Sequence, residues 1–342
     1  MWRAWVEGVI AGRYVGVASK LYRTVTMLPS WCFAAAIRGR HLLYDRGILN
    51  AQKAAVPVIS VGNLVCGGTG KTQFVMLLAH LLMEQGHKVG ILSRGYRSDA
   101  GKAKYVEPTM SAQQCGDEPL LMARRLPDTC VVVGSDRVRA ADLAVAKGAE
   151  ILLLDDGMQH RRLKRDVEIV LVNEEDDLCA YEYLPRGRLR ELPSRLKYAD
   201  IILYTEKLPL KTRQWTQAPC VEVKIVHDGV FDVTGQPMSV PERVALFCGI
   251  GKPQKFVKTV QEMGCEVVKT HFLSDHQKMT KVSLERFSQQ AQALGAQALL
   301  CTEKDWIKGV CPVSLPVGWV RTKMIVIQGE GMLKSIVERK CV

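Results

Sequence analysis

A glycine-rich stretch near residue 70 carries the residue types that hold nucleotide phosphates. The apolar segment 57–61 leads into Gly67-Gly68-Thr69-Gly70-Lys71-Thr72, and a helical pattern of apolar residues follows over 74–85. Backbone N–H groups in such a loop point inward and bind phosphate oxygens, while glycines remove the Cβ atoms that would block close approach. The lysine supplies a charge for the β- and γ-phosphates, and the threonine hydroxyl can bind Mg²⁺. We therefore expect ATP·Mg²⁺ to be held by Val65, Cys66, Gly67, Gly68, Thr69, Gly70, Lys71 and Thr72.

The first position of this loop departs from the strict phosphate-binding pattern, which places glycine where this chain has Val65. The strand, loop and helix context still favours phosphate binding over a glycine-rich turn without a ligand. The loop alone does not identify the class, because GTPases, partition ATPases and kinases all use it. A regulatory nucleotide switch is the alternative to an enzyme of metabolism, and Thr302-Glu303-Lys304-Asp305 loosely matches a guanine-reading motif.

Two pairs of adjacent carboxylates could supply the other groups that phosphoryl transfer needs. Asp155 and Asp156 end a buried apolar run at 151–155, where a carboxylate beside Mg²⁺ is expected, although a helix cap after a strand is the alternative. Asp117 and Glu118 lie in a Gly-Asp-Glu-Pro turn. Asp117 could accept the proton of an attacking hydroxyl, but an acidic residue before proline also suits a helix cap. The residues alone leave cap and base equally open.

Short apolar runs rich in Val, Ile and Leu alternate with helical patterns along most of the chain. Continuous apolar runs indicate strands buried on both faces, hence a parallel sheet covered by helices. This predicts an α/β fold with a P-loop NTPase-like, doubly wound, mostly parallel sheet and a second, smaller α/β domain. A β-rich stretch at 221–240 with internal turn signals predicts a β-hairpin linker between the two. The expected strands are 56–61, 88–93, 130–133, 151–155, 167–172, 201–205, 243–248, 265–270, 298–301 and 324–327, and a last helix is expected near 331–339.

The chain is basic, with a formal net charge of +12, and its N-terminal 53 residues contribute strongly to the excess. A basic protein can meet nucleic acid, an anionic membrane or an anionic substrate. The few aromatics do not alternate with basic residues as a surface for single-stranded nucleic acid requires, so no nucleic-acid partner is expected. Apolar residues at helical spacing before residue 30 describe an amphipathic segment, and no uncharged run approaches the length of a membrane span. Such a segment suits the interface of an anionic leaflet or the protein's own core, and the residues alone do not decide.

The length of the chain suggests its number of domains, and its cysteines show no sign of a metal site. With about 150 residues per domain as a guide, 342 residues suggest two domains. We divide the chain into a basic amphipathic segment at 1–50, a P-loop core at 51–215, and a hairpin linker with the second α/β domain at 216–342. The 11 cysteines show no metal-ligand spacing, which is typical of reduced, mostly buried thiols.

Several separated motifs between about residues 57 and 308 resemble those of tetraacyldisaccharide 4'-kinases, a family of lipid A synthesis. Each motif alone is weak, but their joint order and spacing are specific. The chain departs from the family at Met158, where an aromatic is usual, at Asn173, where Asp is usual, and at Arg188, where Pro usually follows the Gly, which leaves the shape of that loop open. The motifs are Val61-Gly62-Asn63-Leu64, Ser93-Arg94-Gly95-Tyr96, Gly116-Asp117-Glu118-Pro119, Asp155-Asp156-Gly157-Met158-Gln159-His160-Arg161, Gly249-Ile250-Gly251-Lys252-Pro253, Asp275-His276 and Thr302-Glu303-Lys304-Asp305.

The resemblance implies transfer of the γ-phosphate of ATP to the 4'-hydroxyl of a tetraacylated glucosamine disaccharide 1-phosphate, giving lipid IVA. It implies that Asp117 is the catalytic base and that His276 of the second domain pairs with it. The Mg²⁺-side groups are then Thr72, Glu118, Asp155 and Asp156.

The acyl chains of such a substrate stay in the bilayer, so membrane contact becomes the favoured role for the basic N-terminus. We expect a monomer held peripherally or monotopically at the cytoplasmic face of the bacterial inner membrane. Gln159 and His160 follow Asp156 closely enough to reach the same cleft, and three arginines could contact the substrate's 1-phosphate. The expected substrate contacts are thus Gln159, His160, Arg137, Arg161 and Arg188.

Overall fold

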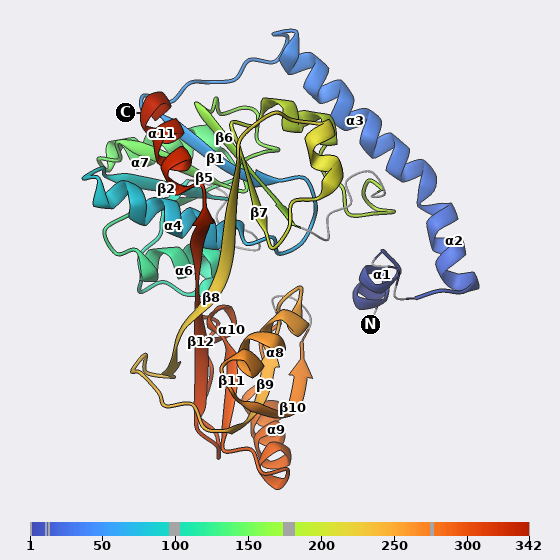
Figure 1. The fold of residues 1–342 in the computed structure, drawn as a ribbon, viewed down its shortest axis with the longest axis vertical. Coiled ribbons are helices and arrows are strands. Elements are labelled where there is room, and N and C mark those ends of the chain that lie inside the picture. The colour runs from blue at the N-terminus through green and yellow to red at the C-terminus, as the bar shows by residue number, and fades with distance from the viewer. Residues whose placement is uncertain are drawn as a thin grey trace.

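One mostly parallel sheet runs through both halves of the molecule. The computed structural model describes residues 2–10, 12, 14–95, 103–173, 182–273 and 277–341, and within these ranges twelve strands pair in the order β10-β9-β11-β12-β8-β7-β6-β1-β5-β2-β4-β3. Figure 1 shows a larger and a smaller half stacked along the long axis of the molecule, joined by two long strands. The predicted fold class, an α/β chain with a large, mostly parallel sheet, is confirmed.

The larger half is built on continuous apolar strands, because each strand is covered on both faces. All six residues of β1 are buried, and β1 lies between β5 and β6 in parallel register. Helices α4, α6 and α11 pack on one face of the sheet and α7 on the other. Its strands are β1 (Val58–Asn63), β2 (Val89–Ser93), β3 (Lys104–Tyr105), β4 (Cys130–Val133), β5 (Ile151–Asp155), β6 (Val167–Asn173) and β7 (Ile201–Thr205), and its helices are α4 (Lys71–Glu84), α5 (Ala112–Cys115), α6 (Asp117–Arg125), α7 (Arg137–Ala146), and the 3₁₀ helices η1 (Pro193–Tyr198) and η2 (Leu210–Gln214).

The smaller half repeats the strand-and-helix pattern around its own apolar core. Parallel strands β10, β9, β11 and β12 form its part of the sheet, and Phe247, Phe287 and Trp319 lie in one of its buried clusters. The elements are β9 (Arg243–Cys248), α8 (Pro253–Glu262), β10 (Glu266–Phe272), α9 (Lys281–Ala293), β11 (Ala298–Thr302) and α10 (Glu303–Trp306).

Two long antiparallel strands join the halves, and they differ from the linker that the sequence suggested. β8 (Cys220–Asp232) pairs with β12 (Val317–Gln328), from Asp232 opposite Gly318 to Glu222 opposite Gln328. The turn expected at Thr234-Gly235 is present, since the Asp232 carboxylate accepts the Thr234 N–H at 2.8 Å and the Gln236 N–H at 3.0 Å. The segment that follows this turn pairs with β8 only through one antiparallel bridge, between Phe231 and Pro237. The main partner of β8 is therefore almost a hundred residues distant in the chain.

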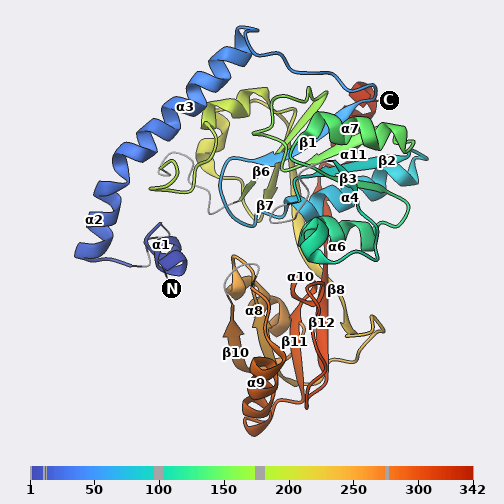
Figure 2. The ribbon, with the colours of Figure 1, turned by 180° about the vertical axis from the view of Figure 1, so that it is seen from behind.

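The end of the chain returns to the larger half. α11 (Glu330–Cys341) buries Leu333 and Val337 in the same cluster as Ile59 and Phe74. In Figure 1, α11 lies in front of the sheet of the larger half, and in the reverse view of Figure 2 α7 lies in front. The division at residues 50 and 215 stays a prediction, and the last helix of the third segment packs on the core of the second.

The N-terminal segment forms three helices along one side of the larger half, and helical spacing before residue 30 is confirmed (Figure 2). These are α1 (Trp2–Ile10), α2 (Val17–Val25) and α3 (Met27–Asp45). The buried residues of α3 are Ser30, Ala34, Ile37 and His41, whose spacing of three or four residues defines a single face toward the protein. No helix within the described ranges has both the length and the apolar character needed to cross a membrane.

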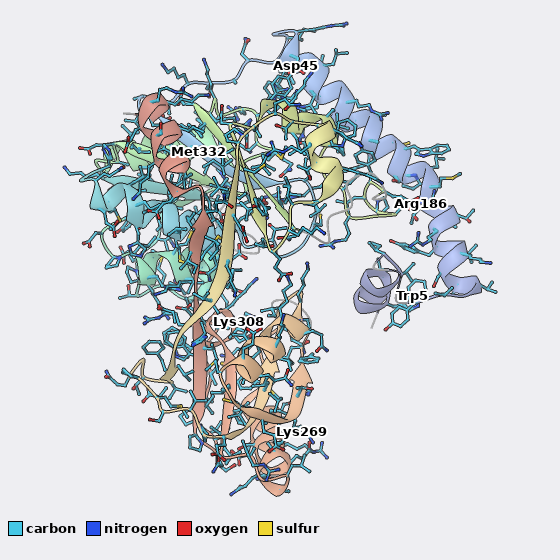
Figure 3. All side chains as sticks on the ribbon, in the orientation of Figure 1. Trp5, Asp45, Arg186, Lys269, Lys308 and Met332 are labelled. Atoms are coloured by element: carbon cyan, nitrogen blue, oxygen red, sulfur yellow. The ribbon has the colours of Figure 1, made fainter. Side chains whose placement is uncertain are left out.

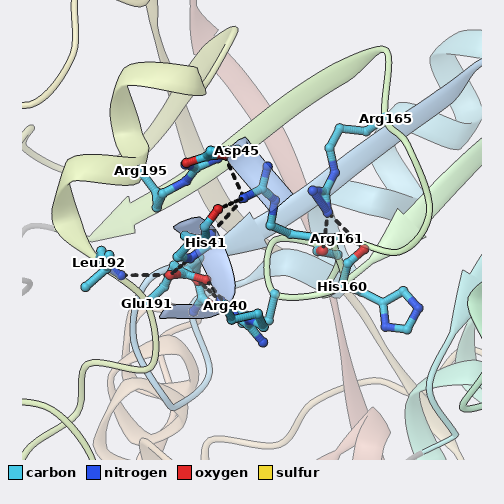
Figure 4. A network of polar contacts seen from close by, with 12 residues as sticks. Arg40, His41, Asp45, His160, Arg161, Arg165, Glu191, Leu192 and Arg195 are labelled. Carbon is cyan, nitrogen blue, oxygen red and sulfur yellow. Dashed lines mark hydrogen bonds and ion pairs between the residues drawn. The ribbon is translucent and has the colours of Figure 1, made fainter. Parts of the chain in front are cut away.

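Polar contacts fix the end of α3 to the larger half (Figure 4). His41 Nε2 lies 2.6 Å from Glu191 Oε1, and Glu191 is fully buried. Arg161 pairs with Asp45 at 2.8 Å. Arg195 reaches the same Asp45 carboxylate at 3.0 Å. A buried carboxylate needs such partners because an unpaired one is costly to desolvate, so this end of α3 is an integral part of the fold.

Replacing Leu333 with alanine tests whether the last helix contributes to the core of the larger half. Leu333 is fully buried, so the loss of its side chain should lower the free energy of unfolding by about 2–5 kcal/mol, measured from denaturant midpoints. The neighbouring Met332 is 45 % exposed, and Met332→Ala is the matched control. Equal, small effects of the two variants would mean that α11 does not pack as described.

Candidate active site

The phosphate-binding loop lies between β1 and α4. The Asn63 side chain donates to Thr69 Oγ1 at 2.9 Å across the loop. Gly67 has φ of 122° and Gly70 has φ of 95°, a region that favours glycine, so two of the loop glycines are required by the backbone. The predicted loop is thus present at the carboxyl end of a central strand, where open α/β sheets bind ligands.

Val65 stands where the usual pattern has glycine because the chain makes a strand contact there. It forms an antiparallel bridge with Leu189 and is 1 % exposed in a small apolar cluster. Next to it, the Cys66 N–H donates to the Arg188 carbonyl at 2.8 Å. The Arg188 guanidinium donates back to the Cys66 carbonyl at 3.1 Å. The segment around residue 189 therefore supports the first part of the loop, and an apolar side chain packs there without strain.

Lys71, Asp156 and Arg190 form one compact group of charges. Lys71 Nζ lies 3.3 Å from Asp156 Oδ1, and Arg190 Nη1 donates to Asp156 Oδ2 at 2.7 Å. A second nitrogen of Arg190 contacts both Asp156 and the Asn63 side chain. Burial alone would raise the pKa of the Asp156 carboxyl, but the two cations outweigh it and hold that pKa well below its usual range.

The turn that follows β5, at Asp156 and Gly157, packs closely against β1. A Cβ on Gly157 would lie 2.4 Å from Ser60 Oγ, so only glycine allows this approach. Asp156 itself has φ of 56°, an uncommon conformation for a residue with a side chain. Such local strain is concentrated at functional sites, where the surrounding structure maintains it.

Asp155 differs sharply from its neighbour. Its Oδ1 atom is buried and has no hydrogen-bond partner among the described residues, and Ser93 Oγ approaches Oδ2 at only 3.5 Å. Burial, with the nearby charges of Glu118 and Asp156, raises the pKa of Asp155 to about 7. A buried, under-satisfied carboxylate beside a phosphate loop fits a hard cation such as Mg²⁺, which takes oxygen ligands.

Mg²⁺ at this position would need more than protein carboxylates. Within the described part of the chain, no three His, Cys, Asp or Glu side chains form a group that could hold a metal ion. Mg²⁺ usually keeps waters and takes one or two carboxylates together with substrate phosphates. The residue set therefore fits an ion that arrives with the nucleotide.

Asp117 and Glu118 open helix α6, facing the second half. Gly116 is the residue before the helix, with φ of 94°, and Asp117 is the first helical residue. Glu118 lies near enough to Asp155 to influence its pKa. Lys304 Nζ lies 3.4 Å from Glu118 Oε1, and Lys308 Nζ lies 4.0 Å from Asp117 Oδ2. His276, the expected partner of Asp117, falls outside the described residues.

The expected substrate residues divide into two groups. Gln159 donates to the Asn63 carbonyl at 3.0 Å, at the end of β1. Burial and the charge of Arg137 lower the pKa of His160 to about 4, so its ring is neutral near pH 7. Burial likewise lowers the pKa of Arg137 to about 10, opposed by Asp155 and Asp156. Gln159 thus bonds at the end of β1 and Arg137 lies near both site carboxylates, whereas His160 lies near Arg137.

Two other expected contacts have structural partners instead. Arg161 is engaged by His41 and Asp45 of α3 (Figure 4). Arg188 supports the phosphate loop through the Cys66 carbonyl. Their contact with substrate stays a prediction.

Residue type and spacing assigned no site role to Arg190, Asn63 or Lys308. Arg190 lies in the same Pro-Arg-Gly-Arg-Leu-Arg-Glu stretch as Arg188, and only the fold shows which arginine reaches Asp156. Asn63 ends a buried strand directly before the loop, and a polar residue at that place is the one available signal. Lys308 follows α10 and reaches Asp117 only because the two halves meet.

The strand–loop–helix unit and the carboxylates at the end of the adjacent β5 define a P-loop nucleotide-binding protein. Residues 23–340 match the tetraacyldisaccharide-1-P 4'-kinase family. The chain is similar to the tetraacyldisaccharide 4'-kinase of Chlamydia abortus, with 38 % identity over 91 % of this chain and 89 % of that protein. It is 41 % identical to that of Chlamydia pneumoniae over 75 % of this chain and 73 % of the relative.

A crystal structure of LpxK from Aquifex aeolicus in complex with ATP is also similar. It superposes with a TM-score of 0.77 at 32 % identity, covering 94 % of this chain and 100 % of that one. The chain belongs to the tetraacyldisaccharide-1-P 4'-kinase family, as the sequence motifs predicted. The alternative of a regulatory nucleotide switch is not favoured, and Thr302 and Asp305 of the guanine-like motif bond to each other inside the smaller half.

Replacing Lys71 with alanine removes the loop's cation and leaves Asp156 paired with Arg190. We expect the rate of phosphoryl transfer to fall by about 10²-fold or more, because one main electrostatic stabiliser of the transferred group is lost. The thermal midpoint should change little. Lys334→Ala, which removes a surface ion pair with Glu330 on α11, is the control and should keep full activity. Near-normal transfer in the Lys71 variant would exclude this loop as the nucleotide site.

Proposed function

We propose that this chain transfers the γ-phosphate of ATP to the 4'-hydroxyl of a tetraacylated glucosamine disaccharide 1-phosphate. The observation that carries the proposal is the Lys71–Asp156 pair at the phosphate loop, with the charge of Glu118 close enough to act on the neighbouring Asp155, in a chain of this family. Phosphoryl transfer needs positioning and charge neutralisation more than covalent chemistry, and this arrangement offers both. The product would carry a second phosphate on the sugar at its opposite end.

Nucleotide binding follows from the loop. Its amides and Lys71 would hold the phosphates, as in other P-loop proteins. Mg²⁺ would neutralise phosphate charge when it is bound. The residues that would hold it are Thr72, Glu118, Asp155 and Asp156. Of the two aspartates, Asp155 is the stronger candidate for a direct ligand, because Asp156 already has two cationic partners.

The proton of the sugar hydroxyl needs an acceptor on the opposite side of the phosphate. We assign this role to Asp117, at the start of α6, with His276 as its partner. The helix N-terminus supports a carboxylate electrostatically. Gly116 occupies the N-cap position, and Asp117 is the first residue of the helix.

Asp117→Asn tests this assignment most directly, by transfer of radiolabelled γ-phosphate from ATP to the acylated disaccharide 1-phosphate. Asn is nearly isosteric but cannot take a proton, so kcat should fall by about 10²–10⁴-fold with little change in ATP affinity. Wild-type protein should label the lipid, whereas the nucleotide switch would hydrolyse ATP without labelling it. Full activity of Asp117→Asn would exclude Asp117 as the base.

We also propose that the N-terminal helices contact the membrane that holds the substrate, at the cytoplasmic face of the bacterial inner membrane. Leu21, Val25, Leu28 and Trp31 repeat at intervals of three or four residues along α2 and α3, and each is more than 60 % exposed. The basic side chains of Lys20 and Arg38 are also exposed on these helices. An exposed apolar stripe with basic neighbours is typical of a helix that lies in the interface of an anionic leaflet.

Changing Leu21, Val25, Leu28 and Trp31 together to serine should reduce binding to vesicles that contain anionic lipid, measured by co-sedimentation. The loss should persist at high salt, because it removes the apolar part of the attachment, whereas salt screens only the charges. The matched control changes Val282 and Leu294 of the smaller half, which are also exposed, to serine. Unchanged binding in the α2–α3 variant would place the membrane contact elsewhere.

A further inference from the structure

A lysine of the smaller half lies at the junction with the larger half. Figure 3 labels Lys308 where the two halves meet, and α6 and α10 are adjacent there in Figures 1 and 2. The side chain of Lys308 is only 6 % exposed. Lysine is almost never this buried without charged partners, so its surroundings require a specific explanation.

The ammonium group of Lys308 lies between carboxylates of the two halves. Its Nζ is 3.0 Å from Asp305 Oδ1 of the smaller half and 4.0 Å from Asp117 Oδ2 of the larger half. The Asp305 side chain is 5 % exposed and that of Asp117 is 13 % exposed. Such a partly desolvated group of charges is far more sensitive to geometry than an exposed ion pair.

The smaller half holds Asp305, and through it Lys308, in a fixed place. Asp305 Oδ1 accepts the Gly249 N–H at 3.0 Å, and Asp305 Oδ2 accepts the Thr302 hydroxyl at 2.5 Å. These bonds come from the ends of β9 and β11, two central strands of that half. The cation that faces Asp117 is therefore mounted on the rigid part of the smaller half.

The opposite end of α6 is also held by the smaller half and the joining strands. Arg125 Nη1 donates to the Thr322 carbonyl at 2.8 Å and reaches Glu303 at 3.2 Å. The Lys304–Glu118 pair adds a contact at the first turn. The orientation of α6, and with it the position of Asp117, is thus set by contacts at both of its ends.

We propose that Lys308 is a positioning residue for phosphoryl transfer, which holds the carboxylate of Asp117 toward the reacting groups when the two halves are together. This rests on the proposed role of Asp117 as the base. The Asp305–Lys308 pair then couples the placement of the smaller half to the placement of the base, because Asp117 loses this partner when the halves separate. Lys308 itself neither binds nucleotide nor takes a proton.

The test combines Lys308→Gln with Asp117→Asn, measuring kcat, the KM for ATP and the thermal midpoint. Gln can still bond to Asp305 but lacks the cation, so kcat should fall by about 10²-fold while the KM for ATP stays unchanged. Lys308→Arg restores the charge with a different reach, and should give an intermediate kcat. In the double variant, kcat should equal that of Asp117→Asn alone within about twofold, because residues that act as a unit are not additive. Lys258→Gln, which removes an exposed ion pair in α8, should leave kcat unchanged.

Each contrary result has a distinct meaning. Wild-type kcat in folded Lys308→Gln, with Asp117→Asn inactive, overturns the inference and leaves the proposed base intact. Full activity of Asp117→Asn alone contradicts the proposed function instead. A double variant whose loss equals the product of the single losses means that Lys308 acts independently of Asp117, which also overturns the inference. If Lys308→Gln does not unfold cooperatively, Lys308→Arg replaces it in the comparison with Asp117→Asn. An unchanged kcat in Lys308→Arg would then overturn the inference.

Discussion

The parallel pairing of β1 with β5 is the constraint on which the site depends. Their register sets Val61 beside Asp155, so the strand that enters the phosphate loop and the strand that ends in two carboxylates finish at the same edge. Parallel strands bring their carboxyl ends together, and the glycine turn after β5 then moves Asp156 within 3.3 Å of Lys71. Backbone pairing thus concentrates opposite charges where a polyanionic nucleotide would bind.

The carboxylates at this edge have different surroundings, which gives them different chemistry. Asp156 has two cations within bonding distance and keeps its charge. Asp155 is buried without an equivalent partner, and its pKa is raised to about 7. Neighbouring residues of the same type can therefore serve as an electrostatic anchor and as a ligand for a hard cation. The two carboxylates have different surroundings because the chain turns at Asp156, which has a positive φ, directly after Asp155 at the end of β5.

Local patterns predicted much of this architecture, and long-range contacts account for the remainder. Buried runs predicted β4, β5, β7 and β9 with their observed bounds, because burial on both faces leaves continuous apolar segments. The partner of β8 was not predictable from its own residues, since β12 comes almost a hundred positions later. Likewise, the glycines of the loop indicate a phosphate site by their residue type. Arg190 and Lys308 cannot be told from surface cations in the sequence, because only the fold brings them to Asp156 and Asp117.

The adjacent residues Arg190 and Glu191 limit which parts of the chain can be removed without disturbing the site. Arg190 points to the phosphate site, and the adjacent Glu191 is fully buried against His41 of α3. Cutting the chain after α3 would remove His41 and Arg40, the side chains of α3 that contact the Glu191 carboxylate, one residue from the site. The exposed side chains of α2 and α3, by contrast, can be altered without touching these contacts. The N-terminal helices are thus joined through α3 to the segment that carries Arg190 into the phosphate site.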